Sequence, residues 1–264
     1  MLELYQFELS QYSEKVRFIL DYKGLEYRKI EVTPGIGQVE LFQKTGQRQV
    51  PVLKDGSRYI SDSTEIVKYI DAQNPESPLM PQDPKLRGLC LMMEEWADES
   101  IGTKSRKALF SAISKDQSFR KSLLPNSTPD LLKSLVEGVP SDLLQVFGLG
   151  VGYSPDAVKA AIADLQQDLE ALTLILEDSP YLLGNEPCLA DFVVAGLSIL
   201  LKFPDGDYLD LPETIKGKGV PGLADNPIYQ PFFEWRDKLY TQFRKPIIGS
   251  SRNTPSAPTS IQIE

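Results

Sequence analysis

Residues 50–63 read VPVLKDGSRYISDS, and this stretch decides the fold. Two short apolar runs flank Asp55-Gly56, a pair that is typical of hairpin turns. The Ser-Asp-Ser at 61–63 is composed of residues that begin helices. Pro51, at the head of the first run, cannot donate to a sheet, which leaves the backbone of Val50 open to another partner. We therefore expect strand, turn, strand and helix start, forming together a pocket for a small peptide-like anion.

The residues before this stretch predict a strand–helix–strand unit. Leu2–Phe7 alternates apolar and polar residues, as a half-buried strand does. A helix follows, with Ser13 expected as its N-cap and Gly24 just past its end. Tyr27–Val32 reads as a second strand, and a short helix is expected over Val39–Lys44. The N-terminal order is then β-α-β-α-β-β-α, a mixed four-stranded sheet with helices on both faces.

A proline-rich stretch divides the chain, with four prolines between Asn74 and Pro84. Beyond it the pattern is helical. The expected helices are Lys85–Ile113 (with a break allowed at Gly102), Pro155–Glu177, the almost wholly apolar Leu189–Phe203, and Tyr229–Phe243. We predict domains at 1–76 and 86–247, a linker at 77–85 and a disordered tail at 248–264.

Two segments carry no clear assignment. Within 117–155, short helices are expected near 119–124 and 131–137, and 148–153 is glycine-rich. A phosphate-binding loop is disfavoured there, because no strand precedes the glycines and no Gly-Lys-Ser or Gly-Lys-Thr follows them. The 204–227 loop could shape a substrate pocket or a dimer interface.

Composition excludes several function classes. The net charge is −9 and no local run is strongly basic, so nucleic acid is an unexpected partner. There is no histidine, which excludes Ser-His-Asp and Cys-His catalysis and histidine-ligated metals. The cysteines, Cys90 and Cys188, stand far apart in sequence, so neither a metal site nor a dithiol pair is indicated. With no signal peptide visible and no apolar run near the ~20 residues that span a bilayer, we expect a cytoplasmic protein without membrane contact.

Four ordered motifs resemble the soluble glutathione transferase family over about residues 1–245. They are Ser10-Gln11-Tyr12-Ser13-Glu14-Lys15-Val16-Arg17, Gln49-Val50-Pro51-Val52-Leu53, Asp62-Ser63 with Ile66 and Tyr69, and Leu189-Ala190-Asp191. The resemblance implies a thioredoxin-like βαβαββα N-terminal domain, an all-helical C-terminal domain and a homodimer. Among family members the chain looks most like the serine type.

The resemblance places the thiol-activating hydroxyl on Ser10. The chemistry is plausible on physical grounds, since a glutathione thiol with a pKa of ~8.5 is only about 3% thiolate at pH 7. A hydroxyl at the start of a helix can donate to the thiolate and add the field of the helix N-terminus. Without a histidine, Ser10 would act as a donor and not as a nucleophile. An ordinary helix-start serine is the alternative, and Tyr12 and Ser13 are the rival donors.

The resemblance also implies how glutathione is recognised. A cis Val50-Pro51 bond would present the backbone of Val50 to the cysteinyl backbone, as in strand addition. Gln49 and either Lys44 or Arg48 would approach the glycyl end. Asp62 and Ser63 would hold the γ-glutamyl group. The alternative for Asp62, Thr64 and Glu65 is a capping box of D-x-x-E form, and both can hold together.

A hydrophobic electrophile pocket is implied between Tyr12 and the long helix, at Trp96, Ser100 and Lys104, although these residues could equally be core or solvated faces. Cys188 departs from the family, which usually has Ser or Thr there as a helix cap, and a thiol is a poor cap acceptor.

The function implied is conjugation of glutathione to a hydrophobic electrophile in detoxification, with glutathione as co-substrate and neither metal nor organic cofactor. The alternatives are a non-catalytic glutathione-binding or regulatory module, and a glutathione-dependent peroxidase or thiol reductase. A thiol reductase would be expected to carry cysteine at position 10.

Overall fold

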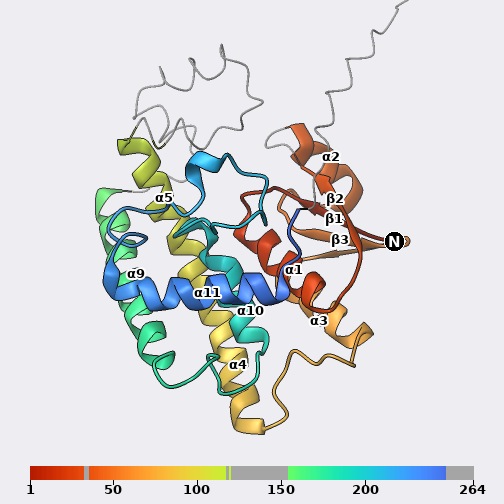
Figure 1. Cartoon of the computed structure of the whole chain (residues 1–264). Helices are drawn as coiled ribbons and strands as arrows, with labels where there is room; N and C mark the ends of the chain where they lie inside the picture. The colour runs from red at the N-terminus through yellow and green to blue at the C-terminus, as the bar shows by residue number, and fades with distance from the viewer. Residues whose placement is uncertain (33–35, 117–118, 120–153, 248–264) are drawn as a thin grey trace, which may run out of the picture.

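A mixed sheet of four strands occupies one side of the molecule and a group of helices the other (Figure 1). The computed structural model describes residues 1–32, 36–116, 119 and 154–247. The strands are β1 (Leu2–Gln6), β2 (Tyr27–Glu31), β3 (Val52–Asp55) and β4 (Arg58–Ser61). Their order is β2-β1-β3-β4, with β1 and β2 parallel and the other pairs antiparallel.

Helices cover both faces of this sheet, as the alternation of side chains requires. They are α1 (Gln11–Tyr22), α2 (Ile36–Thr45) and α3 (Ser63–Gln73). Leu4, Leu53 and Ile60 belong to the large core shared with α1 and α3. Tyr5 and Val52 pack instead with a residue of α2, Leu41, on the opposite face. The βαβαββα order predicted from the sequence is therefore confirmed.

The cap of α1 corrects one detail of the sequence prediction. Ser13 was expected to cap this helix, but the helix begins at Gln11 and Ser10 is its N-cap. Ser10 has extended backbone angles, with φ −77° and ψ 112°, and its side chain accepts a hydrogen bond from the backbone N–H of Ser13. The cap therefore lies one turn earlier, on the residue whose oxygen can reach the third N–H of the helix. Gly24 follows the helix with φ +69°, as expected.

The second part of the described chain is helical. Its helices are α4 (Pro84–Ala97), α5 (Thr103–Lys115), α9 (Pro155–Ile175), α10 (Leu189–Leu197) and α11 (Gln230–Phe243). The single long helix predicted over 85–113 is interrupted by a π-helical turn, Asp98–Gly102, so the break begins four residues before the expected glycine. The 3₁₀ turns are Ser198–Leu200, Glu213–Ile215 and Pro227–Tyr229.

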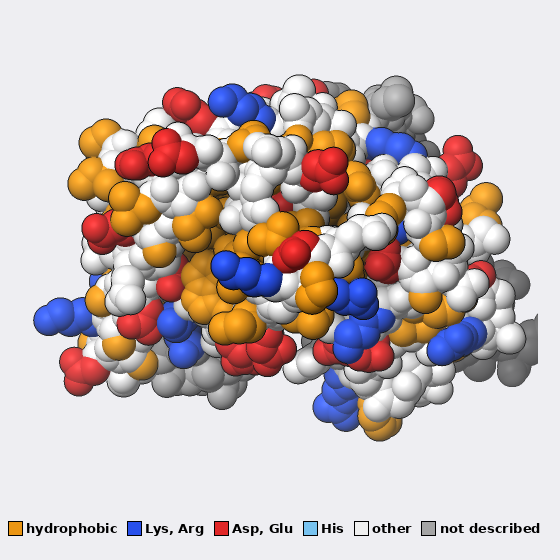
Figure 2. Space-filling model, turned by 90° about the horizontal axis from the view of Figure 1, so that it is seen from below, with side chains coloured by type: hydrophobic (Ala, Val, Ile, Leu, Met, Phe, Trp, Pro, Cys, Tyr) orange, Lys and Arg blue, Asp and Glu red, His pale blue; other side chains and the backbone are white. Residues whose placement is uncertain are grey.

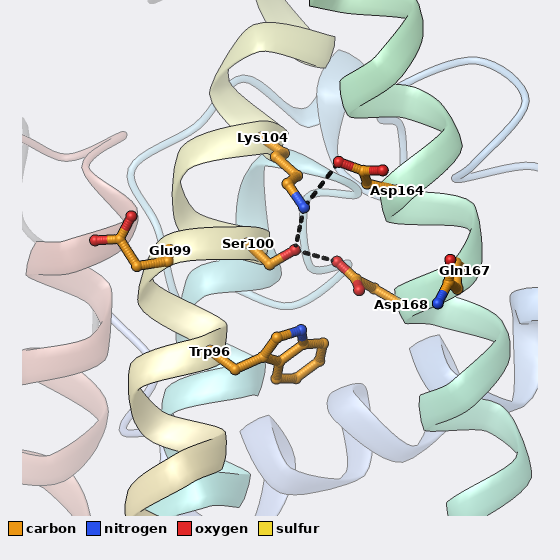
Figure 3. A pocket seen from close by; sticks show the side chains of 7 residues that line it. All are labelled: Trp96, Glu99, Ser100, Lys104, Asp164, Gln167 and Asp168. Atoms are coloured by element: carbon orange, nitrogen blue, oxygen red, sulfur yellow. Dashed lines mark hydrogen bonds and ion pairs between the residues drawn. The ribbon is translucent and has the colours of Figure 1, made fainter.

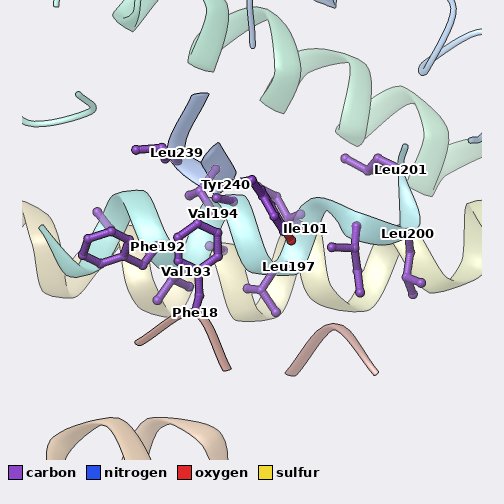
Figure 4. Close-up of a cluster of buried hydrophobic side chains, with 14 of the residues drawn as sticks. Phe18, Ile101, Phe192, Val193, Val194, Leu197, Leu200, Leu201, Leu239 and Tyr240 are labelled. Atoms are coloured by element: carbon purple, nitrogen blue, oxygen red, sulfur yellow. The ribbon is translucent and has the colours of Figure 1, made fainter. Parts of the chain in front are cut away.

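The apolar helix that begins at Leu189 was predicted to be the centre of this helical part, and α10 is at its centre. Every residue of α10 is buried, and aromatic and aliphatic side chains from α1, α11 and the π turn pack around it (Figure 4). Phe18 of α1 contacts Phe192 and Tyr240, with ring centroids 5.6 and 4.9 Å apart. Helix α1 is thus held between the sheet and α10, which joins the two halves of the molecule.

The described residues leave some expectations untested. The short helices and the glycine-rich stretch expected within 117–155, and the tail expected over 248–264, lie outside them, apart from Phe119, Ser154 and Pro155. The 204–227 loop is described, and it lies against the start of α1. The backbone N–H of Asp210 donates to Glu8 at 3.0 Å, and Arg244 donates to the carbonyl of Tyr208 at 3.3 Å.

Helices α1 and α10 approach each other closely at Gly196. A Cβ added there would lie 2.9 Å from the backbone nitrogen and Cα of Lys15, so neither helix could yield by turning a side chain. We expect Gly196→Ala to lower the free energy of unfolding by about 1–3 kcal/mol, measured by urea denaturation.

The matched control is Gly88→Ala on the exposed side of α4, where an added Cβ meets nothing within 4 Å. This change should be neutral or stabilising by up to about 1 kcal/mol, because alanine favours the helix. Equal effects of the two substitutions would contradict the close packing of α1 against α10.

Candidate active site

Three chain segments that the sequence singled out meet at one end of the sheet. Tyr5 of β1 is opposite Val52 of β3, and Val52 is opposite Ser61 of β4. At this end of the sheet β1 ends and leads to the loop that carries Ser10. β3 begins here, directly after Val50-Pro51, and β4 ends here and continues into Asp62-Ser63. The antiparallel pairing thus brings together residues that are up to about fifty positions apart in sequence.

The hydroxyl of Ser10 accepts one hydrogen bond, and its own proton is not donated to any described residue. Its oxygen accepts the Ser13 N–H at 3.2 Å, and no described residue accepts a hydrogen bond from Ser10. Ser10 itself is half-buried at the N-terminus of a helix of 12 residues. The geometry therefore leaves its proton available to an anion that is placed over the start of α1. The Ser13 hydroxyl is buried without a partner.

The Val50-Pro51 peptide bond is cis, as the sequence analysis expected. Pairing of β3 starts only at Val52, and the backbone of Val50 makes no hydrogen bond with the rest of the described chain. An extended peptide could therefore pair with it. Gln49 is exposed next to this edge.

The two basic residues proposed for the glycyl end both lie on aromatic rings. The Lys44 ammonium is 5.9 Å from the centroid of the Tyr5 ring, and the Arg48 guanidinium is 5.2 Å from that of Phe42. Both side chains are exposed, so either could turn towards a carboxylate.

Asp62 and Ser63 combine a cap with an open polar group. Asp62 has a φ of 73°, in the left-handed region that few residues other than glycine adopt. Its Oδ1 accepts the N–H groups of Thr64 at 2.9 Å and Glu65 at 3.1 Å, so Asp62 caps α3. The Glu65 carboxylate pairs with Lys68, so only the Asp62 half of the expected capping box is present. Ser63 is buried, and its hydroxyl makes no hydrogen bond to the described residues. Strained backbone at a polar cleft is typical of ligand-binding positions.

A buried ionic cluster, not foreseen from the sequence, fixes the loop that carries Ser10. Arg17 donates to the carbonyl of Glu8 at 2.9 Å and to the carboxylate of Glu14. Glu14 also accepts two hydrogen bonds from Arg244, at 2.9 and 3.0 Å. We call Glu8, Glu14, Arg17, Asp21 and Arg244 the α1 ionic cluster; Arg244 reaches it from the segment after α11.

The electrostatics of Glu14 follow from this cluster. Burial alone would raise its pKa, but Arg244 and Arg17 lower it to about 2. The carboxylate is therefore charged at every pH at which the protein is expected to work. The only sequence signal for the cluster was a run of charged residues that alternates with the apolar residues of α1.

A second buried contact ties α1 to α3 and α4. The Lys15 ammonium lies 2.6 Å from Glu94, 2.7 Å from Asp98 and 3.1 Å from the Thr64 hydroxyl. Burial raises the pKa of Asp98 in spite of Lys15, and its Oδ1 has no partner. Thr64 is thereby fixed directly beside Ser63.

The residues proposed for the electrophile pocket fall into two places. Trp96, Ser100 and Lys104 line a pocket of about 460 Å³ against α9 (Figure 3). Tyr12 does not line it; its hydroxyl donates to the carbonyl of Asp98 at 3.0 Å, and its ring lies against Gly102.

The pocket is more ionic than the sequence predicted, because α9 contributes two aspartates. Lys104 lies 3.0 Å from Asp164 and donates to Ser100 at 2.8 Å, while the Ser100 hydroxyl donates to Asp168. Burial raises the pKa of Asp168. The sequence did not reveal the two aspartates as neighbours of Ser100 and Lys104, because they lie 60 and 68 residues after their partners, on the polar side of an amphipathic helix.

Comparison with known proteins agrees with this arrangement. Residues 4–78 match the family model described as "Glutathione S-transferase, N-terminal domain". Glutathione S-transferase 1 of Dianthus caryophyllus is 38% identical over 91 residues, which cover 33% of this chain and 41% of that protein. Glutathione S-transferase Z2 of Arabidopsis thaliana is 34% identical over 112 residues, covering 41% and 50%. The chain thus spans half or less of the length of these relatives.

The likeness in fold extends further than the likeness in sequence. A glutathione S-transferase from Rhodospirillum rubrum F11 superposes with a TM-score of 0.61 at 20% identity, covering 91% of this chain and 88% of that one. The beta-etherase LigF of Sphingobium sp. strain SYK-6 gives a TM-score of 0.59 at 21% identity, covering 88% and 98%. The fold is a thioredoxin-like domain followed by a helical domain. Residues 4–78 are thus a glutathione S-transferase N-terminal domain by sequence, and over most of its length the chain has the fold of these solved structures.

Within the described ranges, no group of three or more Cys, Asp or Glu side chains could hold a metal ion. None of the helices in that part of the chain has the length and apolar character needed to cross a bilayer.

The α1 ionic cluster predicts an acid-dependent stability. Because the pKa of Glu14 falls from 4.5 to about 2 on folding, its contribution is complete above pH 4.5 and is lost as the pH falls towards 2. At pH 6, Glu14→Gln should lower the free energy of unfolding by about 3–5 kcal/mol, since two buried guanidinium groups lose their carboxylate. The difference in the free energy of unfolding between wild type and Glu14→Gln, measured by urea titration, should become steadily smaller as the pH falls from 4.5 to 2.

Glu65→Gln is the control, because Glu65 forms an exposed pair with Lys68 at 2.8 Å. Its effect should stay below about 1 kcal/mol at every pH. A Glu14→Gln deficit that does not change with pH would contradict the charge of Glu14 as the source of the stabilisation.

Proposed function

We propose that the chain is a glutathione transferase that activates the glutathione thiol through Ser10. The observation that carries this proposal is the open donor of Ser10 at the start of α1, because its acceptor side is already held by the Ser13 N–H. Because no described residue accepts its proton, the hydroxyl is free to donate to a thiolate that lies over the start of α1. The serine-type assignment is part of this proposal.

The energies involved are of the right size. Making the thiolate the major form at pH 7 requires lowering its pKa by about 2 units, which is ~2.7 kcal/mol. A hydroxyl that donates to an anion contributes about 1.5–3 kcal/mol. The N-terminus of α1 adds about 0.3–1 kcal/mol. Ser10 and α1 together are thus sufficient without a histidine, a metal or an organic cofactor.

Glutathione would bind along the end of the sheet. Its cysteinyl backbone would pair with Val50, next to the cis bond to Pro51, and Gln49 with Lys44 or Arg48 would meet the glycyl carboxylate. Ser63 would donate to the γ-glutamyl carboxylate, and the second oxygen of Asp62 would receive the ammonium. These roles are supported by the open backbone of Val50 and the unpaired hydroxyl of Ser63.

The reaction proposed is displacement at a hydrophobic electrophile. The thiolate sulfur forms the new bond to carbon, the leaving group departs with the bonding pair, and the thiol proton is released to solvent. We expect Tyr12 to border the electrophile, because it lies two residues after Ser10 and is half-buried. The pocket at Trp96, Ser100 and Lys104 has an ionic lining that suits a hydrophobic electrophile poorly.

A homodimer in a cytoplasmic setting is also part of the proposal. Large apolar side chains are exposed on α4 and at the end of α9, namely Leu89, Leu91, Met92, Leu174 and Ile175. One face of the molecule collects apolar side chains around a hollow that charged groups surround (Figure 2). Exposed apolar surface of this kind is typical of contacts between subunits.

Ser10→Ala tests the catalytic role. We expect kcat/KM for glutathione with a chlorodinitrobenzene-type electrophile to fall by about 10- to 100-fold, the loss of one hydrogen bond to an anion. Because Ser10 is also a helix cap, the melting temperature is measured in parallel. Ser10→Thr keeps the hydroxyl and should retain most of the activity.

The control is Ser13→Ala, whose buried hydroxyl has no partner, and its activity should stay near that of the wild type. Full activity in Ser10→Ala would move the donor role to Tyr12 or Ser13. A wild-type chain that binds glutathione without turnover would favour a glutathione-binding module instead.

Ser63→Ala tests glutathione recognition. The dissociation constant for glutathione, measured by calorimetry, should rise by about tenfold or more, since a hydrogen bond to a carboxylate is lost. Ser57→Ala, in the exposed turn between β3 and β4, should leave it unchanged. Equal affinities of the two variants would remove Ser63 from the site.

A further inference from the structure

The two cysteines of the chain meet inside the helical domain. Cys90 lies on α4 and Cys188 directly precedes α10, 98 positions further along the chain. Their sulfur atoms are 3.8 Å apart, and the residues are 0% and 4% exposed. The sequence argument against a dithiol pair was therefore wrong, because separation along the chain says nothing of helices that pack side by side.

The surroundings of Cys188 keep its thiol in a fixed position. Its backbone N–H donates to Asp191 Oδ2 at 2.8 Å, and its thiol lies 3.2 Å from the same oxygen. Asp191 Oδ1 accepts the N–H of Leu182 at 2.8 Å. Asp191 thus makes the reciprocal half of the capping box that begins α10, and it also accepts a hydrogen bond from the Cys188 thiol.

The two thiols differ in acidity. The hydrogen bond with Cys188 and the backbone N–H of Ala190, at the start of α10, lower the pKa of Cys90. The hydrogen bond with Cys90, burial and the charge of Asp191 raise the pKa of Cys188. Cys90 is therefore the thiol that ionises first, with Cys188 beside it as a protonated partner.

We propose that Cys90 and Cys188 form an oxidisable dithiol that closes to an intrachain disulfide when it reacts with hydrogen peroxide. The Cys90 thiolate attacks one peroxide oxygen, the O–O bond breaks, and the departing hydroxide takes up a proton to leave as water. The Cys188 sulfur then attacks the resulting sulfenic acid, and a second water leaves with the Cys188 proton. Two thiols and one peroxide give one disulfide and two waters.

The geometry favours closure within one chain. A disulfide needs its sulfur atoms about 2 Å apart, so they must approach by a little under 2 Å, which is within reach of small side-chain rotations. Because both residues are buried, a reagent reaches the thiols only through local opening of the structure, so the large glutathione disulfide should react far more slowly than the small peroxide. The thiol pair also lies on the helical domain and uses no residue proposed to bind glutathione, so its test is independent of the proposed function.

The disulfide would join α4 to the N-terminus of the central helix α10. Closing a loop of 98 residues restricts the unfolded chain strongly, so the oxidised protein should be the more stable form. We expect its melting temperature to rise by several degrees.

The experiment uses the full chain, which contains only these two cysteines. The folded protein is treated with hydrogen peroxide, and catalase then removes the excess. The protein is unfolded in the presence of N-ethylmaleimide, and its mass is measured by intact-protein mass spectrometry. Untreated chains should take up a maleimide at both cysteines. Treated chains should take up none and be lighter by two hydrogen atoms, and dithiothreitol should reverse both this change and the rise in melting temperature.

Cys90→Ser and Cys188→Ser are the matched variants, and neither should gain thermal stability on treatment. Three results would overturn the proposal: unchanged maleimide uptake in treated wild type, added oxygen atoms in place of lost hydrogens, or a disulfide between two chains. Because the wild-type measurement needs no substitution, poor folding of either variant leaves the test intact.

Discussion

The structure depends on one helix whose charged residues are buried. Helix α1 lies between the sheet and α10, so Glu14, Lys15, Arg17 and Asp21 cannot reach solvent. Each must be paired, because an unpaired buried charge is strongly unfavourable. Arg17 pairs with Glu14 on the same helix, and the other partners come from elsewhere in the chain: Glu94 and Asp98 at the junction of α4 with the π turn, and Arg244 after α11. The charges of α1 are therefore all paired only when the two domains are packed against each other as they are in this structure.

These ion pairs also hold the residues of the candidate site in position. Arg17 fixes the carbonyl of Glu8 and so the loop that leads to Ser10, while Lys15 fixes Thr64 beside Ser63. The 204–227 loop joins the same region through Asp210 and Glu8. Residues that never touch glutathione would thus determine where the activating hydroxyl and the γ-glutamyl contacts lie, which is the role expected of a supporting shell.

Local patterns in the sequence predicted most of the fold, whereas the candidate recognition residues came from the family resemblance and stay a prediction. The first strand, the Asp55-Gly56 turn and the Asp62 cap were all predicted from short-range features, and the structure has each of them. The strand is not half-buried as expected, because Leu4, Tyr5 and Gln6 are all buried. The features that the sequence analysis missed all depend on contacts between segments that are far apart along the chain. The partners of Glu14, the meeting of Cys90 with Cys188, and the aspartates that α9 brings to Lys104 all join segments that no local pattern relates. The exact cap of α1 was missed because Ser10 and Ser13 are both good caps by residue type.

The central claim is that Ser10 lowers the pKa of the glutathione thiol, and this can be measured directly. The ultraviolet absorbance of the thiolate, titrated against pH in the binary complex, gives the pKa of the bound thiol. The account predicts a value about 2 units below the ~8.5 of a free thiol, returning by one unit or more in Ser10→Ala but not in Ser13→Ala. A bound thiol with an unshifted pKa, or the same pKa in wild type and Ser10→Ala, would contradict it.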